Sequence, residues 1–314
     1  MSDDRRAPHV VLGATGGSGY AVVEELLDRG LPVRAVSRSP GEAFPESVEV
    51  HAADCTDRNE TVAACADAAA VYQCIGVPYE RWTELLPLIW DNAVEAAGEA
   101  DAPLVVMDNL YAYGPTDEPM TEETPREPEG PKGAIRHELE KMLFRAHEYD
   151  QVRVAIGRAS DFYGPRVNSS TGELVFDAAV DVRTAAWLGS LDAPHTMSYL
   201  PDVARGLVTL ALNEEAYGEV WHLPANDPVT GRRFIEMVFE EVGGEPKMRA
   251  YGYWSLTFAG LFNAQIREVK EVLYQFRDPF VMDTTKFENE FGREVTPYEE
   301  AIAATVDWHR ANAD

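Results

Sequence analysis

The 314-residue sequence predicts an α/β protein, built on a doubly wound parallel sheet and followed by a smaller C-terminal region. Three observations support this fold class. A glycine-rich turn follows the first apolar stretch, apolar strand-like stretches then alternate with amphipathic helical ones, and the alternation weakens beyond Gly164. Strands that alternate with helices form parallel sheets, because each helix carries the chain back to the start of the next strand.

The glycine turn joins the apolar strand 10–12 to a helical stretch that starts at Ala21 and stops at Gly30. Unpaired N–H groups at a helix N-terminus lie at the positive end of the helix dipole and bind pyrophosphate, and glycine lets the phosphates approach the backbone. The turn therefore predicts a dinucleotide site, with a purely structural turn as the alternative. The expected contacts from this turn are Gly13, Thr15, Gly16, Gly17, Ser18 and Gly19.

Four more strands and their helices follow in order. Residues 33–37, 48–52, 69–76 and 103–107 are apolar enough to be buried strands. Residues 57–65, 79–97 and 135–147 have helical spacing, and residues 152–156 form a sixth strand. The carboxyl ends of parallel strands face the ligand, so Asp54, Cys55, Cys74, Ile75 and Gly76 are further cofactor candidates.

The end of the second strand predicts which dinucleotide is bound. An acidic residue there would hold the ribose hydroxyls of NAD, whereas this strand continues into Ser37 and Arg38. An arginine beside a hydroxyl suits a ribose 2′-phosphate, which favours NADP and leaves NAD as the second choice. The alternative is a solvated surface arginine.

The chain is expected to divide near residue 165. Residues 8–165 form the dinucleotide-binding domain, and 166–314 form mainly a substrate-binding region, with about 200–223 returning to the first domain as a helix and a strand. Stretches 230–250 and 253–276 mix aromatics with helical spacing, and 283–291 and 297–308 read as closing helices. The Pro- and Glu-rich stretch 117–132 is expected to be a loop bordering the site.

The charge excludes some partners. The chain has 54 acidic and 27 basic residues, a formal net charge of -27, so nucleic acid and anionic membranes are not expected to bind. Acidic residues are dispersed, and only 5 of the basic residues are Lys, which favours a halophilic surface over an acidic mesophilic one. Three scattered cysteines, no apolar N-terminal segment and no membrane-length run predict a cytoplasmic protein without a metal site.

Several further motifs occur in order. Tyr113-Gly114 follows strand five, Thr124-Pro125 lies in the loop, and Asp161 opens a D-F-Y-G-P segment. The segment 199–204 contains an aspartate followed by Val-Ala. With the glycine turn and Asp54, these motifs resemble the extended short-chain dehydrogenase/reductase (SDR) superfamily of the NAD-dependent epimerase/dehydratase type. The resemblance covers most of the chain and implies a Rossmann fold.

The family's Tyr-x-x-x-Lys motif is missing. Alignment on Tyr113 places Asn109 at the family's Ser position, and alignment of residues 131–136 places Lys132 at the tyrosine and Arg136 at the lysine. In this interpretation Lys132 supplies a proton, Arg136 holds the ribose and Asn109 orients a carbonyl. Tyr111 and Tyr163 are further acid candidates. Alternatively, Lys132 and Arg136 are exposed charges at the start of a helix.

The resemblance implies an NADP-preferring oxidoreductase or epimerase/dehydratase acting on a small carbonyl, carbinol or nucleotide-sugar-like substrate, and a homodimer as a possible assembly. A non-catalytic NADP-binding sensor or scaffold is the alternative. A nucleotide-sugar enzyme would need a diphosphate clamp, for which Arg232, Arg233 and Arg267 are available. His195 is expected at the surface, with contact to substrate as the alternative.

Overall fold

A computed structural model describes residues 7–41, 44–167, 171–252 and 270–312 of the chain. The chain forms two compact units. The first contains residues up to Asp108 together with 135–158 and 204–223, and the second contains 109–134, 159–203 and 224–314. Each unit is described by itself.

The first unit is organised around a seven-stranded parallel sheet with the order β11-β6-β5-β4-β1-β2-β3. In the order of the chain, the strands are β1 (His9–Leu12), β2 (Val33–Ser37), β3 (Glu49–Ala52), β4 (Ala70–Gln73), β5 (Leu104–Asn109), β6 (Val154–Ala159) and β11 (Glu219–His222). The order reverses at β1, between β2 and β4. In doubly wound sheets this switch point is where ligands bind, at the carboxyl ends of the strands.

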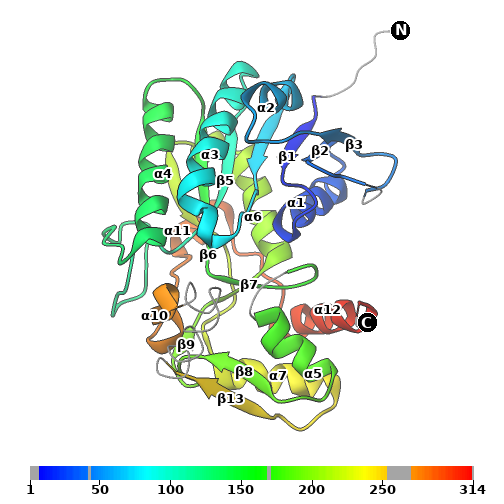
Figure 1. Ribbon diagram of the computed structural model, residues 1–314, viewed down its shortest axis with the longest axis vertical. Helices are drawn as coiled ribbons and strands as arrows, with labels where there is room; N and C mark the ends of the chain where they lie inside the picture. The colour runs from blue at the N-terminus through cyan, green and yellow to red at the C-terminus, as the bar shows by residue number, and fades with distance from the viewer. Residues whose placement is uncertain (1–6, 42–43, 168–170, 253–269, 313–314) are drawn as a thin grey trace. The chain divides into compact units, whose positions relative to one another are not determined.

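Helices cover both faces of this sheet. Arg29 at the end of α1 (Gly17–Asp28) donates to Thr209 of α6 (Leu200–Leu212), so these two helices share a face. α2 (Arg58–Cys65), α3 (Trp82–Glu99) and α4 (Pro131–Glu148) cover the other face, where Figure 1 shows α3 and α4 side by side. Neighbouring residues of β6 point to opposite faces, since Gly157 lies against Leu207 of α6 and Arg158 bonds Glu140 of α4.

Local sequence explains where these helices begin and end. α1 buries Val22, Val23 and Leu26 against the sheet and continues to Asp28, just before Gly30 with its φ of 67°. The Asp57 side chain caps α2 by accepting a hydrogen bond from the Glu60 N–H, as expected of an aspartate at this position.

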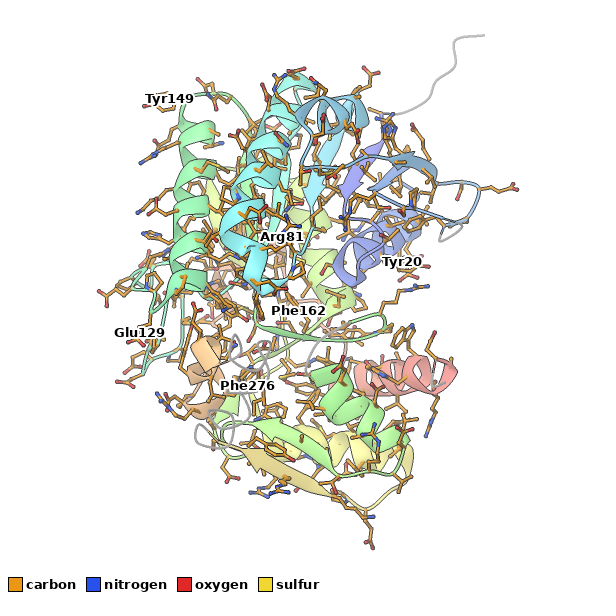
Figure 2. The ribbon with its side chains drawn as sticks, in the orientation of Figure 1. Tyr20, Arg81, Glu129, Tyr149, Phe162 and Phe276 are labelled. Atoms are coloured by element: carbon orange, nitrogen blue, oxygen red, sulfur yellow. The ribbon has the colours of Figure 1, made fainter. Side chains whose placement is uncertain are left out.

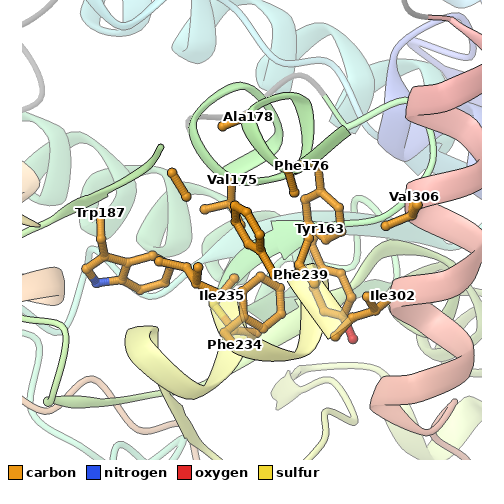
Figure 3. Packing of buried hydrophobic residues seen from close by; sticks show 14 of the residues in the cluster. Tyr163, Val175, Phe176, Ala178, Trp187, Phe234, Ile235, Phe239, Ile302 and Val306 are labelled. Carbon is orange, nitrogen blue, oxygen red and sulfur yellow. The ribbon is translucent and has the colours of Figure 1, made fainter. Parts of the chain in front are cut away.

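The second unit has its own aromatic core (Figure 3), in which Tyr163 packs against Phe176, Phe234 and Tyr298. The elements around it are β7 (Asp161–Tyr163), the π-helix η2 (Gly172–Asp177), α5 (Ala178–Val180), β8 (Ala185–Leu188), β9 (Pro194–His195), β10 (Met197–Tyr199), β12 (Val229–Thr230), α7 (Gly231–Val242), β13 (Met248–Tyr251), the 3-10 helix η4 (Lys270–Val272), α10 (Tyr274–Arg277), α11 (Thr285–Phe291) and α12 (Tyr298–Ala311). Its strands form two-stranded pairs, β10 with β7, β12 with β9 and β13 with β8.

The predicted fold class is confirmed, and the differences concern element boundaries. The stretch 230–250 is predicted as helical, but α7 ends at Gly243, whose φ of 77° turns the chain toward β13. The predicted loop 117–132 ends earlier, because α4 begins at Pro131. Most of the stretch 253–276 lies outside the described residues. Residues 204–223 group with the first unit, and residues 109–134 and 159–165 group with the second.

Over the ranges that the structure describes, no helix is both long and apolar enough to cross a membrane.

Candidate functional site

The glycine turn of the first unit leaves a helix N-terminus open. Gly16 is the N-cap of α1, and no side chain caps the helix among the described residues. A Cβ on Gly19 would lie 2.3 Å from the Gly13 oxygen, and Gly13 itself has a φ of 82°, so the fold requires both glycines. At Gly16 a Cβ would meet only that same oxygen, at 3.4 Å. Glycine is one of the residues preferred at an N-cap, and among the described residues this one also leaves room for a ligand to approach the backbone.

The turn is hydrogen-bonded to the end of β2. The N–H groups of Gly13 and Ala14 both donate to the carbonyl of Val36, at 2.9 and 3.1 Å. Arg38, two residues further along, is exposed and has no hydrogen-bond or ion-pair partner among the described residues. The buried Ser37 precedes it, and the Ser37 carbonyl accepts from the Ala53 N–H. Arg38 is thus beside the turn and exposed, whereas the hydroxyl of Ser37 is buried.

Asp54 lies at the same edge of the sheet, just beyond β3. Its carboxylate accepts from the backbone N–H and the hydroxyl of Thr56, and these bonds, aided by the charge of Arg38, lower the pKa of Asp54. The side chain is therefore a fixed, exposed acceptor at neutral pH, as an adenine contact requires. Arg38 and Asp54 act on each other through space, which agrees with their predicted place in one site.

Strand β4 brings its end to the turn as well. The Cys74 N–H donates to the Leu12 carbonyl, and Ile75 lies where a Cβ on Gly13 would fall. Gly76 has open space around its Cα. Desolvation raises the pKa of the Cys74 thiol to about 12, and burial raises that of Cys55 to about 11, so both remain thiols at neutral pH. Their contribution to the site would be through shape and backbone.

In the second unit, Asn109 is the last residue of β5, and Tyr111 lies in the turn that follows. The Asn109 Oδ1 accepts from the Tyr111 N–H at 3.1 Å, which fixes the side chain while its amide N–H groups, the donors that a carbonyl would need, take no part in this bond. The Tyr111 hydroxyl accepts from Nε2 of the buried Gln275 at 3.5 Å, and Tyr111 is 8% exposed. Gly133 packs onto the backbone of Tyr111, because a Cβ on Gly133 would lie 2.5 Å from the Tyr111 carbonyl oxygen. The position of Tyr111 is thus fixed by neighbours on both sides.

Lys132 is buried, with 4% of its surface exposed, which contradicts its interpretation as an exposed charge. Its ammonium lies 2.8 Å from Oε2 of Glu271, and its N–H donates to Oε1 of the same carboxylate at 2.6 Å. Glu271 therefore both caps the first turn of α4 and forms an ion pair with Lys132. A carboxylate this near stabilises the charged ammonium.

Arg136, in the first unit, is also buried and belongs to an ion network. Its guanidinium donates to Oδ1 of Asp108 at 3.1 Å and lies 4.2 Å above the ring of Trp82. The other carboxylate oxygen of Asp108 accepts from Nε of Arg158 at 2.9 Å, and Nη2 of Arg158 donates to Glu140 at 2.7 Å. These contacts give Arg136 a structural role, and its predicted contact with a ribose stays a prediction.

Four further candidates lie in positions other than expected or are already paired. His195 is 2% exposed and bonds Asp161, so its expected surface position is wrong. Tyr163 lies in the aromatic core, and burial raises the pKa of its hydroxyl far above its usual value, which excludes it as a proton donor. Arg232 and Arg233 pair with Asp192 and Glu240, and Arg267 lies outside the described residues.

The residues that sequence reasoning missed are those that bond the candidate residues or bond one another beside them. They are Asp108, Glu140, Arg158, Asp161, Glu271 and Gln275. Apart from Asp161, none lies in a quoted motif, and Glu271 and Gln275 lie more than a hundred residues from Lys132 and Tyr111. The D-F-Y-G-P segment was the one available signal, for Asp161. No cluster of three metal-ligating side chains occurs in the part of the chain that the structure describes.

Comparison with known proteins places the chain in a family. The model of the NAD dependent epimerase/dehydratase family matches residues 9–223. A curated relative, the uncharacterized protein y4nL of Sinorhizobium fredii, is 26% identical over an alignment of 242 residues, and the match covers 69% of this chain. The match spans 65% of that relative's length.

Solved structures with this fold have low sequence identity to the chain. WbmH of Bordetella bronchiseptica in complex with NAD+ is 19% identical with a TM-score of 0.77, and the match covers 98% of this chain and 99% of that one. Thermus thermophilus UDP-glucose 4-epimerase with NAD is 18% identical (TM-score 0.78, 98% and 100% covered). Thermotoga maritima UDP-glucose 4-epimerase with UDP-glucose is 17% identical, with the same TM-score and coverage.

Proposed function

Because the chain belongs to the NAD dependent epimerase/dehydratase family, whose members are SDR-type enzymes, we propose that it is a dinucleotide-dependent oxidoreductase or epimerase/dehydratase. Its substrate is a small carbonyl, carbinol or nucleotide-sugar-like molecule, and NADP is its preferred cofactor. The carrying observation is the open N-terminus of α1, where Gly16 leaves space that no part of the described protein fills. A pyrophosphate there would be held by backbone N–H groups and by the helix dipole.

The preference for NADP rests on Arg38. Its position beside the glycine turn and its lack of a bonded partner in the described ranges leave its guanidinium free to bind a 2′-phosphate. Asp54 at the same edge is the acceptor proposed for the adenine. NAD lacks the 2′-phosphate and would meet Arg38 only as a neutral ribose, so it is proposed as the weaker ligand.

Replacing Arg38 with aspartate is expected to weaken NADPH binding about 10- to 100-fold, because a charged hydrogen bond is replaced by repulsion. NADH binding should be unchanged or tighter. Titration of both cofactors by protein fluorescence or calorimetry measures the change. The control is Arg310→Asp, the same charge reversal at an exposed arginine of α12 that pairs with Asp307. Equal affinity of the unaltered protein for NADH and NADPH would contradict the proposal.

For the chemistry we propose Tyr111 as the proton donor and acceptor of the second unit. Its hydroxyl is held by Gln275, whereas Lys132 is already paired with Glu271. We propose that Lys132 and Arg136 stabilise the fold through their ion pairs with Glu271 and Asp108. Asn109 is proposed to fix the Tyr111 backbone. The alternative, a cofactor-binding sensor, is favoured if NADPH binds and no substrate is turned over.

We also propose that the protein is adapted to high salt, works in the cytoplasm and forms a homodimer. With a formal charge of -27, self-repulsion should weaken the fold at low ionic strength. The melting temperature is expected to rise from about 0.1 M to 3 M KCl, over which the screening length falls from about 10 Å to below 3 Å. Sodium sulfate at matched ionic strength separates screening from general salting-out. A flat or falling melting temperature in KCl would contradict halophily.

A further inference from the structure

The loop that joins β3 to α2 in the first unit carries Asp54, and hydrogen bonds hold its backbone at both ends. The Ala53 N–H donates to the Ser37 carbonyl at 3.1 Å, which ties the loop to the end of β2. The Asp54 carbonyl accepts from the Asp57 N–H at 2.8 Å, which closes a turn directly ahead of α2. The direction in which the Asp54 side chain points therefore depends on the groups that hold this backbone.

Glu60, in the first turn of α2, holds the backbone of Asp54. Its Oε2 accepts from the Asp54 N–H at 2.7 Å, while its own N–H donates to the side chain of Asp57, the N-cap. An N-cap residue followed three positions later by glutamate forms a capping box, in which the glutamate ordinarily accepts from the N–H of the N-cap residue. Here the carboxylate reaches three residues further back. Glu60 thus fixes the residue proposed to contact adenine.

Asn92 of α3 holds the next residue of the loop, Cys55. Its Nδ2 donates to the Cys55 carbonyl at 3.0 Å, and Asn92 is 4% exposed. Arg81, which Figure 2 labels, lies at the start of α3, and Asn92 follows about three turns further along the helix. All other buried residues of this helix, which the structure describes in full, are aliphatic or tryptophan. An amide is costly to bury without a partner, so the bond to the loop offsets the burial of Asn92.

The same loop leaves one oxygen of the Asp54 carboxylate open to a ligand. The N–H and the hydroxyl of Thr56 both donate to Oδ1, at 3.0 and 2.8 Å. Oδ2 has no hydrogen-bond partner among the described residues, and Asp54 is exposed. A carboxylate oxygen accepts a hydrogen bond from an amino group, and adenine carries one amino group, at its position 6. Oδ2 is therefore the oxygen that the proposed contact with adenine would use.

We infer that Asn92 and Glu60 are positioning residues for the adenine end of the cofactor site. The inference rests on the proposed function and extends it, because neither residue lies in a motif of the sequence and neither touches the ligand. Each acts through a backbone group of the loop, Glu60 through the Asp54 N–H and Asn92 through the Cys55 carbonyl. Loss of either bond lets the loop turn Oδ2 of Asp54 away from the amino group. The cost then falls on recognition of the base.

The test compares NADPH with deamino-NADPH, in which a carbonyl oxygen replaces the 6-amino group of the adenine. Calorimetry gives both affinities, and their ratio measures the contact made by this amino group. We expect the unaltered protein to bind NADPH about tenfold more tightly, because a hydrogen bond to a carboxylate is replaced by two acceptors that face each other. Asp54→Ala, which removes the carboxylate, should bring the ratio close to one.

The variants Asn92→Leu and Glu60→Met should each lower this ratio about three- to fivefold, the usual contribution of one hydrogen bond. Glu60→Gln keeps an oxygen that accepts the Asp54 N–H, so its ratio should stay within about twofold of the unaltered protein. Folded proteins are expected, because leucine resembles asparagine in size and favours a helix, and Glu60 is exposed. A residue with a merely structural role would change the melting temperature and leave the ratio as it is.

Arg58→Gln is the matched control. Arg58 is the first residue of α2 and pairs with Glu95 and Glu99 of α3, so it joins the same two helices without a bond to the loop. Its replacement removes these ion pairs and should leave the ratio of the two affinities within about twofold.

The outcomes separate this inference from the proposed function. If Asp54→Ala loses the preference for NADPH and Asn92→Leu or Glu60→Met keeps it, the inference is overturned for that residue, while the adenine contact stands. A loss in Arg58→Gln equal to that in Asn92→Leu overturns the positioning role as well. Equal affinity of the unaltered protein for NADPH and deamino-NADPH overturns the adenine contact and this inference together, and dinucleotide binding stands. Failure to bind NADPH overturns the proposed function itself.

Discussion

Replacing Arg158 with methionine is expected to lower the free energy of unfolding by about 3–5 kcal/mol, the typical cost of removing one partner from a buried ion pair. Arg158 is fully buried and bonds two carboxylates, those of Asp108 and Glu140, which are themselves buried. Methionine fills a similar volume but takes this cation away from both carboxylates. Urea unfolding followed by tryptophan fluorescence measures the loss, since Trp82 and Trp90 lie beside Arg136.

The matched control is Arg153→Met. Arg153 lies just before the same strand and pairs with the fully exposed Asp101, so its loss should cost less than about 1 kcal/mol. A triple variant, Arg158→Met with Asp108→Asn and Glu140→Gln, removes the charges together and should recover part of the stability. If Arg158→Met and Arg153→Met cost the same, the network does not hold the unit together.

The fold was predictable because its signals are local. The glycine turn that follows the first strand, the helical spacing between strands and the small residues at strand ends are all short, local features of the sequence. The second strand, predicted at 33–37, is β2 with the same bounds, whereas α1 and α4 each begin four residues earlier than predicted. α4 starts at Pro131 because Glu271 accepts the N–H of Lys132, and a contact between residues 139 positions apart leaves no local trace.

The candidate site was predictable in the first unit and less so in the second. The glycine turn and Arg38 follow strand ends, and the topology of a parallel sheet brings strand ends together. Lys132 and Arg136 were found by alignment to a motif, but alignment does not reveal what a side chain bonds. Their partners Glu271 and Asp108 decide their roles, and both partners lie outside that motif. Charge balance inside a fold depends on distant residues, which single-sequence reasoning does not bring together.

Replacing Tyr111 with phenylalanine is expected to lower turnover by about 10²- to 10⁴-fold, the usual contribution of a positioned acid or base. The change removes one oxygen and keeps the ring, so folding and NADPH affinity should be unchanged. A substrate is first sought by NADPH oxidation in a screen of carbonyl compounds and nucleotide sugars. Turnover of the variant on that substrate, together with NADPH titration, then measures the effect.

Lys132→Met separates the two proton-donor candidates. The Lys132 ammonium is paired with Glu271, so the substitution should lower thermal stability. The Glu271 carboxylate would still accept the N–H of residue 132 but would lose this positive charge. Lys132→Met with Glu271→Gln, which removes both charges, should restore part of that stability and retain turnover if Tyr111 is the donor. Gln275→Leu, which removes the bond to the Tyr111 hydroxyl, should lower turnover with little change in NADPH affinity. If Tyr111→Phe has normal turnover and the double variant at Lys132 and Glu271 is inactive, Lys132 is the proton donor instead.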